Sequence, residues 1–214
     1  MNVNAKTGPI AFPSQTEFKK GSLAFQRHEK RDAMYRIAAF LVEHFWGKAA
    51  DIADGLGVLL LTWNQALYRY GQFDFSCVEQ CIKKHQALLE TFRSRNIRSF
   101  GSADEQIVAT LFDDFLDALR IVDGSKAGTK SPVATAKALH LLAPAFFPLW
   151  DNKIARAYGC HYTFKPAAKY IRFMEKTQAF AKTLGSSIDE GRNGRTLLKL
   201  IDEYNYAKYT KHWI

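Results

Sequence analysis

Apolar residues recur every three or four positions along most of this chain, which is the spacing of one face of an α-helix. Met34, Ile37, Leu41 and Phe45 show the pattern, and Gly47 is a fitting end for their helix. The same spacing predicts further helices over residues 49–70, 75–92, 102–120, 132–142, 151–159, 166–184 and 194–208. No run alternates as a half-buried strand would. The sequence therefore predicts an all-α fold.

The start of the helix predicted over residues 102–120 carries a capping signature. Ser102 stands at the expected N-cap, and Glu105 follows three residues later, where a capping box places its acid. Residues 1–20 are expected to form an irregular N-terminal arm. Residues 21–214 are expected to form a single globular domain, in which two helical lobes around a cleft near residues 120–160 are one possible arrangement.

The charge of the chain narrows the choice of partners. Thirty Lys and Arg residues against 21 Asp and Glu give a formal net charge of +9, which favours polyanions such as nucleic acid, then acidic proteins or anionic membrane surfaces. No apolar run approaches the roughly 18 residues that a membrane span needs. The start MNVNAKTGPIAFPSQ has no secretory signal pattern, so a cytoplasmic protein is expected.

Three cysteines form no disulfide framework. Cys77, Cys81 and His85 share one helical stripe, which raises a metal site as an alternative. A structural zinc site uses four ligands at tight spacing, so buried thiols are the preferred interpretation. Neither a metal nor a cofactor is expected.

Asp151 is the residue on which the functional hypotheses depend. It follows the apolar run FFPLW and precedes NKIARAYG, so it is placed to cap a helix that Gly159 ends. Trp150 and the phenylalanines would also screen its carboxylate from water, which suits a group that stabilises positive charge in a pocket. A cap alone and a catalytic carboxylate are both consistent with this pattern.

The surrounding order of residues resembles the catalytic end of the helix-hairpin-helix (HhH-GPD) DNA glycosylases. Thr135 and Ala136 lead into an apolar helix, APAFFP forms the loop, and LWDNKI precedes Arg156 and Gly159. Upstream, GVLLLTWNQALYR stands where that family carries the polar helix facing its base pocket. The resemblance covers about residues 51–159. It implies a compact multi-helix glycosylase-like fold, double-stranded DNA as partner, and Asp151 as the catalytic carboxylate.

The chain also departs from the family pattern. The hairpin glycines fall on Lys130, Ser131 and Pro132, and the proline removes a backbone donor. The lysine of the lyase members falls on Ala134. An active protein of this type would therefore be a monofunctional-like N-glycosylase, with Lys130 as one possible substitute for the missing lysine.

Two groups of candidate residues complete the hypothesis. The base pocket would be lined by Trp63, Asn64, Tyr68, His140 and Trp150, although a buried Asn or His is also commonly a satisfied core group. The contacts to DNA would be made by Lys126, Lys130, Ser131, Lys137, Lys153 and Arg156.

Two other functions remain open at this stage. A non-enzymatic helical module for nucleic acid or protein would explain the altered hairpin. An enzyme acting on a small phosphorylated ligand through the loop at residues 124–131 is a third hypothesis, although that loop lacks the GxxxxGK[ST] and GxGxxG patterns.

Overall fold

The computed structural model describes residues 12–185 and 195–214, and within these ranges the chain is all-helical. The prediction of an all-α protein is confirmed for this part of the chain, where the only β-type pairing is an isolated bridge between Phe73 and Ile121. The helices are α1 (Gln15–His28), α2 (Ala33–His44), α3 (Ala49–Trp63), α4 (Gln65–Tyr68), α5 (Phe75–Arg93), α6 (Ser102–Ala118), α7 (Pro132–Leu142), α8 (Asn152–Ala157), α9 (Pro166–Thr183) and α10 (Leu197–Asn205), and a π-helical turn covers Tyr206–Thr210.

The N-terminal helix α1 was not predicted. It begins at Gln15, so residues 15–20 are helical and the prediction of an irregular arm is wrong for them; residues 1–11 lie outside the described residues. Ser14 caps the helix by accepting a hydrogen bond from the Glu17 backbone N–H over 3.2 Å. The pattern Ser-x-x-Glu is a capping signature, so the sequence did carry a signal for this helix.

Two further local predictions need correction. The helix expected over residues 49–70 is divided at Asn64, which ends α3 and precedes α4. The cap of α6 is Gly101 and not Ser102, and its backbone N–H donates to the carboxylate of Asp104 over 2.9 Å. Glu105 therefore does not have the capping role expected for it. The predicted start of the last helix, at residue 194, lies outside the described residues.

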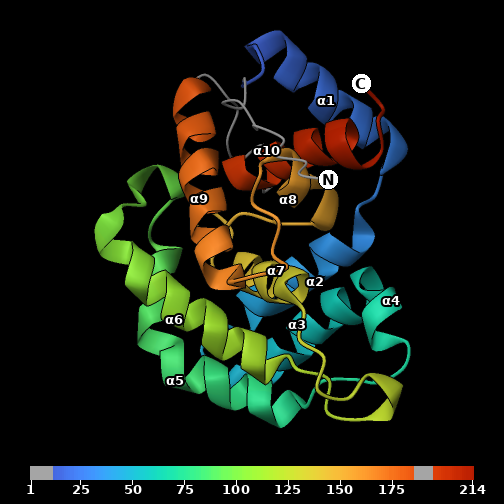
Figure 1. The fold of residues 1–214 in the computed structure, drawn as a ribbon, viewed down its shortest axis with the longest axis vertical. Coiled ribbons are helices and arrows are strands. Elements are labelled where there is room, and N and C mark those ends of the chain that lie inside the picture. Colours follow the sequence, from blue (N-terminus) through green and yellow to red (C-terminus); the bar gives the residue numbers. More distant parts are fainter. Residues whose placement is uncertain (1–11, 186–194) are drawn as a thin grey trace, which may run out of the picture.

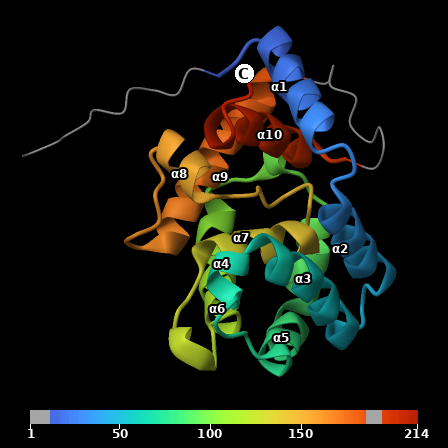
Figure 2. The same cartoon turned by 90° about the vertical axis from the view of Figure 1, so that its right-hand side faces the viewer.

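The core is centred on α7, which packs against α2, α3, α6 and α9. Figures 1 and 2 show α7 between the end that holds α1 and α10 and the opposite end that holds α5 and α6. The residues from Ala134 to Leu142 are buried except for Lys137. A helix with apolar residues on nearly all sides is one that other elements surround.

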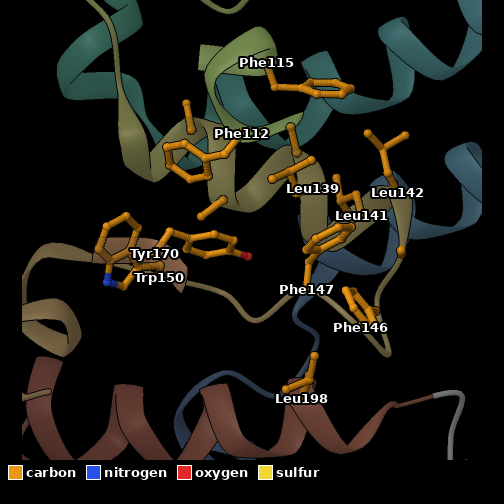
Figure 3. Packing of buried hydrophobic residues seen from close by; sticks show 14 of the residues in the cluster. Phe112, Phe115, Leu139, Leu141, Leu142, Phe146, Phe147, Trp150, Tyr170 and Leu198 are labelled. Carbon is orange, nitrogen blue, oxygen red and sulfur yellow. The ribbon is translucent and has the colours of Figure 1, made fainter. Parts of the chain in front are cut away.

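The FFPLW run completes this core. Phe146 stacks on Phe92 with ring centroids 4.5 Å apart, and Trp150 packs against Tyr170 at 5.4 Å. Figure 3 shows both phenylalanines of the run near Leu141 and Leu142, with Trp150 beside Tyr170. Burial of these rings fixes the link after α7 and so fixes where Asp151 begins α8. In the described ranges no helix has both the length and the apolar character to cross a bilayer.

Candidate functional site

Both oxygens of the Asp151 carboxylate make hydrogen bonds. Oδ1 accepts from the backbone N–H of Ile154 over 2.7 Å, which is the predicted helix cap. Oδ2 accepts from the hydroxyl of Thr210 over 2.8 Å, from the π-helical turn near the end of the chain. A carboxylate has further lone pairs, so these two bonds orient it and leave it able to interact with a third group.

Asp151 lines a cavity of about 240 Å³. The cavity lies where the link between α7 and α8 passes between α1 and α10 on one side and α3 and α7 on the other. Rings and ionisable groups form its walls together. The lining residues are Phe25, Glu29, Asp32, Trp63, Lys137, Leu149, Trp150, Asp151, Lys199, Asp202 and Tyr206.

Lys199 provides a buried positive charge at this cavity. Its side chain is 1% exposed, and its Nζ lies 2.9 Å from Oδ2 of Asp32 and 3.6 Å from Oδ2 of Asp202. Its ammonium also faces the rings of Tyr35 and Phe25, at 4.5 and 4.7 Å from their centroids. Burial by itself lowers the pKa of Lys199, but the carboxylates of Asp202 and Asp32 outweigh it and raise the pKa.

Asp32 has the backbone conformation of a residue under local constraint. Its φ is +40°, in the left-handed region that non-glycine residues seldom adopt. It precedes α2 but its side chain does not cap that helix. The carboxylate is instead paired with Lys199. Positive φ at a non-glycine residue commonly accompanies functional sites, because the surroundings must offset the local cost.

Lys137 is the second lysine of the cavity, and it is held by Asn64. Its Nζ donates to Asn64 Oδ1 over 2.6 Å and lies 5.4 Å from the ring of Trp63. Burial lowers the pKa of Lys137 to about 8, against the opposing charges of Asp151 and Asp202. The ammonium is therefore much closer to deprotonation at neutral pH than an exposed lysine.

Asp202 is shifted in the opposite sense. Burial raises its pKa to about 7; the charge of Lys199 opposes this rise, and the negative charges of Asp151 and Asp32 add to it. Asp202 thus titrates near neutrality in a cavity where Asp151 is fixed by two hydrogen bonds. A carboxyl that titrates near neutrality is suited to give or take a proton in a reaction.

The structure brings Trp63, Trp150, Lys137 and Asp151 together at the cavity. Trp150 is 1% exposed, and its indole N–H has no acceptor among the described residues. Asn64 does not line the cavity itself, but its Oδ1 accepts a hydrogen bond from the lining residue Lys137. Its Nδ2 is likewise a buried donor without a partner in the part of the chain that the structure describes. Buried donors without partners cost free energy that the packing around them must offset.

Tyr68 and His140 lie outside the lining of this cavity. The hydroxyl of Tyr68 donates to the carbonyl of Leu119 over 3.3 Å. The His140 Nδ1–H donates to the Phe147 carbonyl over 2.8 Å, so its Nε2 is left to accept from the hydroxyl of Tyr35 over 2.9 Å. Burial lowers the pKa of His140 to about 3, so the ring is neutral and ties core elements together.

The six residues predicted to contact DNA are dispersed. Lys137 is inside the cavity wall, whereas Lys153 and Arg156 are exposed on α8 beside Asp151. Lys126 lies over the ring of Tyr70 at 5.2 Å, and Lys130 pairs with Asp117. The hydroxyl of Ser131 accepts from the Ala134 N–H over 3.1 Å and so caps α7.

The loop at residues 124–131 uses several of its backbone donors internally. The N–H groups of Gly128, Ala127 and Thr129 donate to carbonyls of residues 121, 124 and 126. A phosphate cradle needs such donors free and convergent. This pattern gives no support to the hypothesis of a small phosphorylated ligand at the loop.

The helical stripe of cysteines does not assemble a metal site. Cys81 is buried as expected, but Cys77 is exposed, so the prediction of two buried thiols is wrong for Cys77. His85 lies 2.7 Å from the carboxylate of Asp114. Throughout the described ranges, no group of three or more Cys, His, Asp or Glu residues is placed to hold a metal ion.

The residues that sequence reasoning missed come mainly from the two ends of the chain: Phe25, Glu29, Asp32, Lys199, Asp202 and Tyr206. One signal for them existed. Lys199 and Asp202 interrupt the apolar run TLLKLID, and charged residues at buried positions of an apolar helix are expected to be paired. Their partner Asp32, however, cannot be identified from spacing. Comparison of the chain with models of known families, with curated proteins and with solved structures finds no match.

Proposed function

We propose that this protein binds double-stranded DNA and acts as a base-excision N-glycosylase, with a fold of the helix-hairpin-helix glycosylase type. The observation that supports this proposal best is the position of Asp151, whose fixed carboxylate lines a cavity walled by Trp63 and Trp150. An enzyme that works on a base must first take it out of the stack and hold it between apolar or aromatic side chains.

The size of the cavity suits a single nucleic-acid base. Its volume of about 240 Å³ lies below the roughly 300–1,000 Å³ of pockets for drug-sized ligands. A single extruded base is a planar ligand suited to such a space, with its sugar and phosphates left outside. Trp63 and Trp150 give the walls two rings against which such a base could stack.

The charges of the cavity suit the chemistry of base release. Rupture of the glycosidic bond leaves its electron pair on the base and positive charge on the sugar. Asp151 stabilises that charge. Together with Glu29 and Asp32 it makes three acids against the two lysines of the lining, with protonated Asp202 left out of the count. In this proposal protonated Asp202 gives its proton to the departing base. Water then adds to the sugar carbon and releases a proton to solvent.

The exposed basic residues near the cavity would bind the DNA backbone. Lys153 and Arg156 are on α8, which Asp151 begins, and the net charge of +9 favours a polyanion overall. Binding through phosphates predicts that duplex affinity falls steeply as salt concentration rises. A protein that showed no salt-dependent binding to duplex DNA would contradict the proposal at this first step.

The decisive experiment compares the wild type with Asp151→Asn. Single-turnover release of bases from duplexes that carry a panel of damaged bases is measured, and we expect the variant to lose at least 100-fold in rate. Asn is as good a helix cap as Asp, so stability and duplex binding should stay close to wild type. Asp74→Asn, the same substitution at the N-cap of α5 and outside the cavity, is the matched control and should retain activity.

A non-enzymatic DNA-binding or protein-binding module is the second candidate function. Two residues at the position of the family hairpin favour it. The hydroxyl of Ser131 caps α7 where the hairpin would bind phosphate, and Pro132 has no backbone N–H to donate. In that case Asp151→Asn would leave every activity unchanged, and no damaged base would be released by the wild type.

A further inference from the structure

The outer face of α2 combines rings and positive charge in a way that the cavity does not use. One side of this helix packs into the core through Tyr35, Ala38 and Val42. The opposite side is exposed, with Phe40 at 63% and Ile37 at 47% of their full accessible surface. Figure 2 shows α2 along the edge of the molecule, with α3 beside it. Large apolar side chains grouped on a surface commonly mark a binding site.

Two of the exposed side chains form a stacked aromatic pair. The rings of Phe40 and His44, one helical turn apart, have centroids 5.4 Å apart and planes inclined by 16°. Next to Phe40 lies a shallow hollow of about 330 Å³, which is lined by Arg31, Ala33, Arg36, Ile37 and Phe40. A flat ring at the edge of a hollow offers a face on which another flat group can stack.

Two arginines on this face are not paired with a carboxylate of residues 12–185 or 195–214. Within the described residues, neither Arg31 nor Arg36 has a carboxylate at ion-pair distance, although both are exposed. The acid on the same helix, Glu43, is paired with Arg93, which in turn stacks on Trp46 at 3.7 Å. The two guanidinium groups of the hollow are therefore available to an anion.

We propose that the outer face of α2 binds single-stranded nucleic acid. A base stacks on Phe40, with Ile37 beneath it, and Arg31 and Arg36 contact the phosphates on either side of that base. Aromatic faces alternating with cations are the means by which proteins hold unpaired strands without reading their sequence. Two of the five residues that line the hollow are arginines, which suits a polyanion better than the apolar face of a partner helix.

This second site does not require the cavity to be a glycosylase site. The cavity is lined by α1, α3, α7, α10, the link before α8 and Asp32, and none of its lining residues lines the hollow on α2. A strand bound at α2 would be the part of a nucleic acid that is not paired. Its binding can be measured whether or not any base is released, so the two proposals fail separately.

The test is binding of a fluorescently labelled oligothymidylate, which forms no stable secondary structure, measured by anisotropy at several salt concentrations. We expect Phe40→Ala to weaken binding roughly tenfold, the loss of one base–aromatic stack. Phe164→Ala is the matched control: Phe164 is 71% exposed with Lys165 at 5.5 Å from its ring, yet it precedes α9 and not α2. The affinity of Phe164→Ala for the oligothymidylate should stay within about twofold of wild type.

The double variant Arg31→Ala/Arg36→Ala tests the phosphate contacts. Each contact with a single strand contributes about 0.7 to the slope of log affinity against log salt, so losing two should reduce the slope by about 1.4. An equal loss in Phe40→Ala and Phe164→Ala would overturn the proposal, as would oligothymidylate that does not bind the wild type. If Phe40→Ala changes only the molecular mass in light scattering, the face is a protein interface and the proposal is also wrong.

Discussion

The ammonium of Lys199 lies 2.9 Å from the carboxylate of Asp32 and joins α10 to the residue that precedes α2. This ion pair connects the two ends of the sequence at the wall of the cavity. It also faces Asp202 and the ring of Phe25, so one buried cation holds several of the lining groups in place. The positions of Asp32 and Asp202 thus depend on Lys199, which also faces the ring of Trp63 at 5.7 Å.

The first prediction concerns this buried charge. At pH 8, above the pKa of Asp202, Lys199→Met should lower the free energy of unfolding by about 3–5 kcal/mol, because Asp32 and Asp202 would remain buried without their cation. Urea denaturation followed by circular dichroism measures the loss. Adding Asp32→Asn and Asp202→Asn to the same variant should recover part of it. A loss below about 1 kcal/mol in Lys199→Met would show that the pair is solvated and not buried.

The second prediction concerns Lys137. Because its pKa falls from an ordinary 10.5 to about 8, the folded protein binds this proton less tightly than the unfolded chain does. The free energy of unfolding should therefore gain from this group as pH rises from about 8 to about 10.5. Lys137→Met should lack that gain, whereas the exposed Lys182→Met should keep it. Denaturation series across this pH range measure the difference between the two variants.

The third prediction concerns the proposed acid, Asp202. Its pKa of about 7 means that the protonated form disappears above neutral pH, so the rate of base release should fall about tenfold per pH unit there. Asp202→Asn should be slow at every pH and should show no such decline. Single-turnover rates between pH 5.5 and 9 provide the measurement. A wild-type rate that is constant across that range would remove Asp202 from the mechanism and leave the role of Asp151 to be judged separately.

The pH dependence of stability gives a fourth prediction, which tests Asp202 without an activity assay. A carboxyl whose pKa is raised from 3.8 to about 7 binds its proton more tightly in the folded state, so its contribution to stability is present at low pH and is lost as pH rises through about 7. Asp202→Asn should remove this loss. At pH 8 the variant should therefore be at least as stable as the wild type, in spite of the proximity of Lys199.

Much of the fold could be predicted from local patterns, and the misses have physical causes. The helix around Met34–Phe45 and the cap at Asp151 depend on residues within one or two turns, and both are found in the structure. Asn64 was placed inside a continuous helix because the apolar pattern runs through it, yet its side chain is bonded to Lys137 and α3 ends there. Contacts of that kind override local helix propensity.

What the sequence by itself determined is the helical class, the basic charge and a capped aspartate after a buried aromatic run. Only the tertiary structure decided that Asp151 lines a cavity and that Asp32, Lys199 and Asp202 meet there. Periodicity records which face of a helix is buried, because that depends on neighbours three and four residues away. It does not record which distant charge a buried charge will meet, since the pairing is set by how the helices pack against one another.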